Sequence, residues 1–199
     1  MKVVCLYTGN AQGRESATGK MMIYTHHIAK LAGPGLVVYP PDTWKANARR
    51  RLEILREMDC QHLFLGGYSH GQVVCMKIAK LAPQYGIKTV RIVLCDPIGR
   101  NPMLPRWGWA QLLSARSLTP WMKIRVPETV CRVAWVRQEI NRPRAHDLKW
   151  NPETTHVADP VTIHANHSAI QWHQEWIDLV MREIDNWINP PKAIPIVLP

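Results

Sequence analysis

The first half of the chain alternates between short apolar runs and longer segments in which apolar residues recur at helical spacing. The apolar runs are continuous, which is typical of strands in a parallel sheet that is covered on both faces. The predicted strands are residues 2–7, 36–39, 62–65 and 90–94, and the predicted helices are residues 21–31, 44–58 and 72–81. This order predicts an α/β fold in which right-handed crossovers join parallel strands.

The second half of the chain is less regular. Residues 100–126 contain prolines and tryptophans that break the strand–helix rhythm, so we predict an inserted lid there. The other predicted elements are strands at 129–136 and 161–163, a polar loop at 141–159, a helix at 168–188 and an extended tail at 189–199. We expect residues 1–199 to form a single domain, because domains reach roughly 250 residues before they split.

The strand at 62–65 leads into the sequence Gly67-Tyr68-Ser69-His70-Gly71, which contains a Gly-x-Ser-x-Gly pattern. An apolar strand precedes this pattern and an apolar helix follows it, as the turn called a nucleophile elbow requires. We therefore predict that Ser69 is a nucleophile and that Gly67 and Gly71 leave room for the tight turn. The backbone N–H of His70, at the start of the following helix, is a candidate donor to an oxyanion.

With this elbow, the chain resembles the α/β-hydrolase family of esterases, lipases and thioesterases. The resemblance covers most of the chain and also rests on the order nucleophile, acid, histidine. It implies an α/β-hydrolase-like, mostly parallel sheet with helices on both faces and an inserted lid. It further implies that a histidine, oriented by an acid, removes the proton of Ser69. A second oxyanion donor would come from the loop after the first strand, where the N–H of Asn10 is the candidate.

The resemblance also indicates where the histidine and the acid should lie. The histidine is expected after the last strand and before the final helix, which favours His167 over His164, because His164 continues the short strand and is better explained as structural. Asp96 follows the strand after the elbow, at the sheet edge where catalytic groups gather. Most family members place the acid after the next strand, so Asp147 and Glu139 remain alternatives.

Charge and cysteine content bear on partners and location. The formal net charge of +10 would attract anionic surfaces, but the basic residues are scattered apart from the run at 49–51. No nucleic-acid-binding signature accompanies that run, so no nucleic-acid partner is expected. The five cysteines form no Cys-x-x-Cys pair, which predicts buried, reduced thiols. Because a signal peptide and a transmembrane run are both missing, we expect a cytoplasmic protein.

Two further patterns suggest a phosphate or metal site. Residues 13–21 are similar to a phosphate-binding loop, but the glycines are one residue too far apart and Met21 stands where Ser or Thr would bind magnesium. His26 and His27 are adjacent, so on a helix they point in different directions. We therefore predict no metal and no organic cofactor.

These observations predict a serine hydrolase that cleaves an ester or a thioester through an acyl-enzyme on Ser69. The expected substrate is a small or lipid-like molecule with an acyl group, because the apolar residues within 100–126 would form an acyl-binding lid. The alternatives are an inactive hydrolase fold that serves as a binding or virion component, and a basic module for nucleic acid or membrane surfaces. The sequence leaves the natural substrate and the oligomeric state open.

Overall fold

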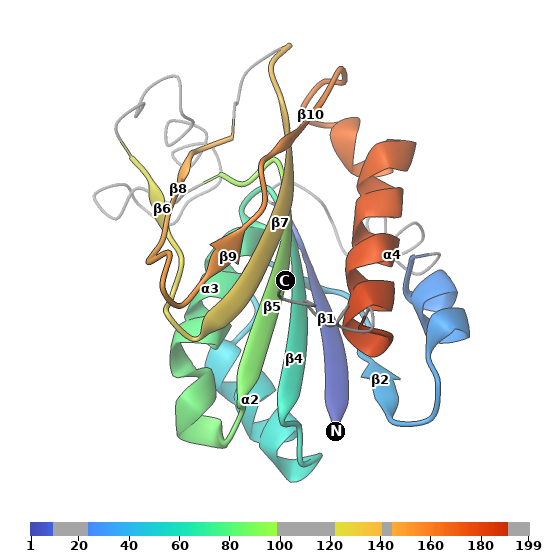
Figure 1. Ribbon diagram of the computed structural model, residues 1–199, viewed down its shortest axis with the longest axis vertical. Coiled ribbons are helices and arrows are strands. Elements are labelled where there is room, and N and C mark those ends of the chain that lie inside the picture. The colour runs from blue at the N-terminus through green and yellow to red at the C-terminus, as the bar shows by residue number, and fades with distance from the viewer. Residues whose placement is uncertain (10–23, 99–121, 141–144, 191–199) are drawn as a thin grey trace, which may run out of the picture.

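Parallel strands form the central sheet of the protein (Figure 1). The computed structural model describes residues 1–9, 24–98, 122–140 and 145–190. Within these residues the main sheet has eight strands and the path β10-β7-β5-β4-β1-β2, with β3 beside β1 and β9 beside β7. The strands are β1 (Lys2–Thr8), β2 (Leu36–Val38), β3 (Asp42–Thr43), β4 (His62–Tyr68), β5 (Thr89–Cys95), β7 (Val130–Gln138), β9 (His156–Val157) and β10 (Val161–Ile163). Their pairings are parallel, which confirms the predicted α/β sheet.

Helices cover both faces of this sheet (Figure 1). The helices α2 (Ala48–Glu57) and α3 (Gly71–Leu81) pack on one face, whereas α4 (Gln174–Ile188) and the helical segment 24–31 pack on the other. A short 3-10 helix, η1 (Ala82–Tyr85), follows α3. Successive side chains of a strand point to opposite faces, so a strand that is buried on both faces must be apolar throughout. This explains why the strands appear in the sequence as continuous apolar runs.

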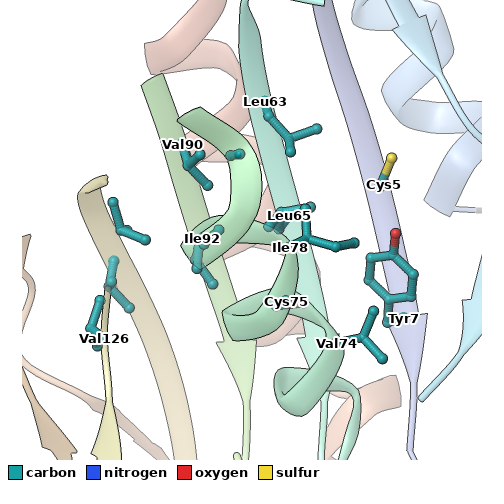
Figure 2. Packing of buried hydrophobic residues seen from close by; sticks show 14 of the residues in the cluster. Cys5, Tyr7, Leu63, Leu65, Val74, Cys75, Ile78, Val90, Ile92 and Val126 are labelled. Carbon is teal, nitrogen blue, oxygen red and sulfur yellow. The ribbon is translucent and has the colours of Figure 1, made fainter. Parts of the chain in front are cut away.

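The side of α3 that faces the sheet is apolar and fully packed. Figure 2 labels Val74, Cys75 and Ile78 of this helix, which belong to one buried cluster with Leu65 of β4 and Ile92 of β5. Each of these five residues is at most 3 % exposed. Burying one such aliphatic side chain stabilises the fold by roughly 1.5–3 kcal/mol. The packing therefore fixes the position of the helix whose first turn follows Ser69.

Strand β4 extends beyond the predicted end at residue 65, because Gly66 and Gly67 continue it to Tyr68. The predicted end at residue 65 was therefore wrong. The lack of a side chain at the glycines serves close packing, since a Cβ at Gly66 would lie 2.4 Å from Cδ2 of Leu6 in the neighbouring strand. The extended strand brings Ser69 to the edge of the sheet.

Two predicted helices also have different bounds. The helix predicted at 44–58 begins only at Ala48, because the side chain of Asn47 accepts hydrogen bonds from the N–H groups of Arg49 and Arg50 at 3.1 and 3.2 Å. The helix predicted at 168–188 is divided into the 3-10 helix η3 (Ile170–Trp172) and α4, because His173 has an extended backbone.

Residues 122–163 contain short strands that the sequence analysis missed. The strands β6 (Ile124–Arg125) and β8 (Leu148–Lys149) form a separate two-stranded parallel sheet, and β9 lies within the predicted loop at 141–159. Each of these missed strands has only two residues, which is too short a pattern to be recognised from sequence. The predicted lid, apart from residues 122–126, and the tail after residue 190 lie outside the described residues.

The cysteines and the basic run are only partly as predicted. All five cysteines are free thiols, and four are buried, but Cys131 is exposed on β7. In the basic run, Arg49 and Arg50 are exposed, whereas Arg51 forms an ion pair with Asp42 at 3.4 Å. None of the helices in the described ranges combines the length and the apolar character needed to cross a membrane.

The contact between the start of α3 and the end of β1 gives a first testable prediction. A Cβ at Gly71 would lie 2.3 Å from the carbonyl oxygen of Tyr7, and a backbone atom cannot rotate away as a side chain can. We expect Gly71→Ala to lower the free energy of unfolding by about 1–3 kcal/mol in urea denaturation. Gly33→Ala is the control, because a Cβ there meets no atom within 4 Å and the change should stay within about 0.5 kcal/mol. Equal unfolding midpoints for the two variants would contradict this account.

Candidate active site

Ser69 occupies the sharp turn between β4 and α3. Its φ of 51° lies in the left-handed region, which residues other than glycine rarely adopt. Two backbone hydrogen bonds hold the turn: the N–H of Ser69 donates to the carbonyl of Cys95 at 2.9 Å, and the N–H of Ile98 donates to the carbonyl of Ser69 at 3.2 Å. A Cβ at Gly9 would lie 2.8 Å from Cβ of Ser69, so the end of the first strand passes directly beside the serine.

Asp96 is the first residue after β5 and has no exposed surface. It also has a positive φ, 43°, a conformation that aspartate tolerates better than most residues. Its N–H donates to the carbonyl of Val136 at 2.9 Å, and its Oδ1 accepts from the N–H of Gln138 at 3.2 Å. The end of β7 therefore fixes both the backbone and the carboxylate of Asp96.

His167 lies between β10 and η3 and connects the other two side chains. Its Nε2 is 3.0 Å from Oγ of Ser69, and its Nδ1 is hydrogen-bonded to Oδ2 of Asp96. Because a carboxylate only accepts hydrogen bonds, the proton of the neutral imidazole belongs on Nδ1. The lone pair on Nε2 then faces the serine hydroxyl, which is the arrangement that a general base requires.

Tyr68 contacts the histidine from the elbow itself. Its hydroxyl donates to the carbonyl oxygen of His167 at 2.6 Å, and its ring stacks on the imidazole with 5.2 Å between ring centroids. Neither Tyr68 nor the backbone donor of Gln138 was among the predicted site residues. No motif marks them, because both contacts join segments that are far apart in the chain.

His70 caps the start of α3 and is almost completely buried, with 3 % of its surface exposed. In the part of the chain that the structure describes, neither ring nitrogen has a hydrogen-bond partner. Burial lowers the pKa of His70 to about 4, and the nearby His167 and His146 add to this effect. The imidazole is therefore neutral at pH 7. The N–H of His70, the predicted oxyanion donor, lies next to Ser69, whereas Asn10 lies outside the described residues.

The structure thus brings together three of the residues that the sequence singled out, Ser69, Asp96 and His167. Of the alternative acids, Glu139 forms an ion pair with Arg137 at 3.2 Å. Asp147 is held through its backbone, whose carbonyl accepts from the N–H of Ile124 at 2.9 Å.

The remaining candidates from the sequence are His164, the adjacent His26 and His27, and the loop at 13–21. His164 is exposed. His26 and His27 have their ring centroids 6.3 Å apart in an edge-on arrangement. The described residues contain no group of three or more His, Cys, Asp or Glu side chains placed to bind a metal ion. The predicted phosphate-like loop at 13–21 lies outside them.

Comparison with known proteins identifies the fold. The sequence matches no protein-family model and no curated protein. The structure is similar to the thioesterase domain that cyclises the lipopeptide antibiotic surfactin, with a TM-score of 0.54, 12 % identity, and coverage of 96 % of this chain and 93 % of that one. It is also similar to BorB, the type II thioesterase from the borrelidin biosynthetic cluster, with a TM-score of 0.51, 11 % identity and coverage of 92 % of both chains. The protein therefore has the α/β-hydrolase fold, as the sequence analysis predicted.

The buried histidine after Ser69 should make stability depend on pH. Unfolded histidine binds a proton below about pH 6.5, whereas folded His70 does so only near pH 4, so folding stability should fall as the pH drops through this range. We expect His70→Gln to reduce the difference in free energy of unfolding between pH 7 and pH 4.5 by about 2 kcal/mol. The measurement is urea denaturation at both pH values, with the exposed His164→Gln as control. An identical pH difference in His70→Gln and wild type would be the contrary result.

Proposed function

We propose that the protein is a serine hydrolase that cleaves an ester or a thioester through an acyl-enzyme on Ser69. The observation that carries this proposal is the hydrogen-bonded line from the Ser69 hydroxyl through His167 to the buried carboxylate of Asp96. A serine hydroxyl is a weak nucleophile at neutral pH unless a base takes its proton, and a base needs a third group to orient it. These three side chains match those roles in both distance and order.

The reaction would proceed in two steps. Nε2 of His167 takes the proton from Oγ of Ser69 as this oxygen attacks the carbonyl carbon, and Asp96 stabilises the resulting imidazolium. The N–H of His70, at the start of α3, donates to the oxyanion, and such a donor contributes about 3 kcal/mol to the transition state. The imidazolium then protonates the leaving alcohol or thiol. Water, activated by the same histidine, releases the acid and frees Ser69.

The proposed substrate class is a small or lipid-like molecule with an acyl ester or thioester. The chemistry supports both, because an alcohol or a thiol leaves from the same kind of tetrahedral intermediate once the imidazolium has protonated it. The two similar solved domains are thioesterases, so acyl thioesters should be tested beside nitrophenyl esters. A series of substrates with rising acyl length would define the preferred acyl group.

The first test is covalent labelling with a fluorophosphonate probe, which reacts with activated serines. We expect one label per chain, mapped to Ser69 by mass spectrometry, and no label in Ser69→Ala. Ser168→Ala is the matched control: this exposed serine lies beside His167, but its hydroxyl donates to Asn166, so labelling should not change. Folded wild-type protein that neither labels nor turns over any ester or thioester would overturn the proposal and favour an inactive binding protein.

A second test addresses the buried acid. In Asp96→Asn the amide preserves the shape but no longer stabilises the imidazolium and favours the wrong histidine tautomer, so kcat should fall about 10³- to 10⁴-fold. Steady-state kinetics on the best ester would measure this loss, and circular dichroism would show that the variant is folded. Glu139→Gln removes an acid that pairs with Arg137 and should keep wild-type kcat. A larger loss in Glu139→Gln than in Asp96→Asn would show that the acid is wrongly assigned.

A further inference from the structure

We infer that Tyr68 is a positioning residue for His167: its hydroxyl and its ring hold the imidazole in line between Ser69 and Asp96. This inference rests on the proposed function, and it adds a residue outside the three that would carry the reaction. Tyr68 is 5 % exposed, so its side chain is committed to the interior of the protein. Its two contacts with His167 are of different kinds, and each limits a different movement of the histidine.

The hydroxyl of Tyr68 fixes the backbone of His167. Residues 164–169, which include the histidine, belong to neither a helix nor a strand, so no regular ladder of hydrogen bonds determines their position. The donation from Tyr68 to the carbonyl of His167, at 2.6 Å, ties this segment to the elbow. Burial raises the pKa of the Tyr68 hydroxyl far above neutral pH, so the group remains a donor. Because Ser69 is the next residue, the nucleophile and the base share one anchor.

The ring of Tyr68 limits rotation of the imidazole. The two rings stack at 5.2 Å with 27° between their planes. The ring of Tyr68 covers one face of the His167 imidazole. If the imidazole rotated about its own Cβ–Cγ bond, it would lose its hydrogen bonds to Ser69 and Asp96 and would collide with the tyrosine ring. An aromatic face also favours a nearby cation, and His167 becomes a cation when Ser69 attacks. The stacking contact therefore supports the histidine in both of its charge states.

The chain provides a matched control in Tyr24. This tyrosine is 6 % exposed, belongs to the same apolar cluster as Tyr68, and its hydroxyl also donates to a backbone carbonyl at 2.6 Å, that of Gln171. Both tyrosines thus bind the segment that follows β10. Of these two tyrosines, Tyr68 contacts His167 and Tyr24 does not. Removing the hydroxyl of Tyr24 therefore tests the stability of the segment, whereas removing the hydroxyl of Tyr68 also tests the alignment of His167.

The experiment compares Tyr68→Phe, Tyr68→Leu and Tyr24→Phe in kcat, KM, rate of fluorophosphonate labelling and Tm. Tyr68→Phe keeps the ring and loses one hydrogen bond, so kcat and labelling rate should fall about tenfold with KM unchanged. Tyr68→Leu loses both contacts and should lower kcat about 100-fold. Tyr24→Phe should lower Tm as much as Tyr68→Phe does and leave kcat unchanged.

A spectroscopic measurement keeps the inference testable apart from activity. The proton between Nδ1 of His167 and the Asp96 carboxylate should give a low-field ¹H NMR signal, which His167→Gln would remove. We expect this signal to weaken or shift in Tyr68→Phe and to remain in Tyr24→Phe.

The inference is overturned if Tyr68→Phe keeps both the signal and the wild-type kcat. It is also overturned if Tyr68→Phe raises KM alone, which would make Tyr68 a substrate contact. Wild-type protein that keeps the signal but fails to label would refute the proposed function alone.

Discussion

The register of the parallel strands decides which side chains meet at the sheet edge. β4 and β5 pair Tyr68 with Cys95, so Ser69 and Asp96 are each the first residue beyond the same pair. β7 and β10 continue the sheet in parallel, and the loop after β10 brings His167 to the same edge. Because consecutive strand residues face opposite sides, a slip of one residue between β4 and β5 would separate the serine from the acid. The packing that maintains this register therefore also maintains the site.

The same edge holds two residues in an unfavourable conformation. Ser69 and Asp96 both have positive φ, and such backbone strain costs on the order of 1–3 kcal/mol at each residue. Hydrogen bonds that continue the sheet offset this cost, from Ser69 to Cys95 and from Asp96 to Val136. The N–H of Ile98 closes the arrangement by donating to the carbonyl of Ser69. Each turn is thus held by a hydrogen bond to the neighbouring strand.

The architecture was largely predictable from the sequence, because burial on both faces requires continuous apolar strands. Prediction failed where local residue preference and packing disagree. Gly66 and Gly67 have weak strand propensity, yet β4 continues through them. Position 66 is glycine because a side chain there would collide with Leu6. His173 interrupts a segment whose apolar spacing is helical, since its extended backbone separates η3 from α4. Strands of two residues carry too little pattern to be found.

The candidate site divides in the same way. Ser69 was predicted because the turn restricts its own sequence. His167 and Asp96 were predicted from the resemblance to the α/β-hydrolase family, with Asp147 and Glu139 as alternatives to Asp96. Tyr68 and Gln138 could not be found, because their partners are set by the tertiary fold: the hydrogen bond from Tyr68 spans 99 residues, and the donor of Gln138 is a backbone N–H. A local motif marks only the candidate nucleophile, since a short turn can be built by neighbouring residues. His167, the proposed base, lies in an irregular segment between β10 and η3, so its alignment depends on contacts that no local pattern records.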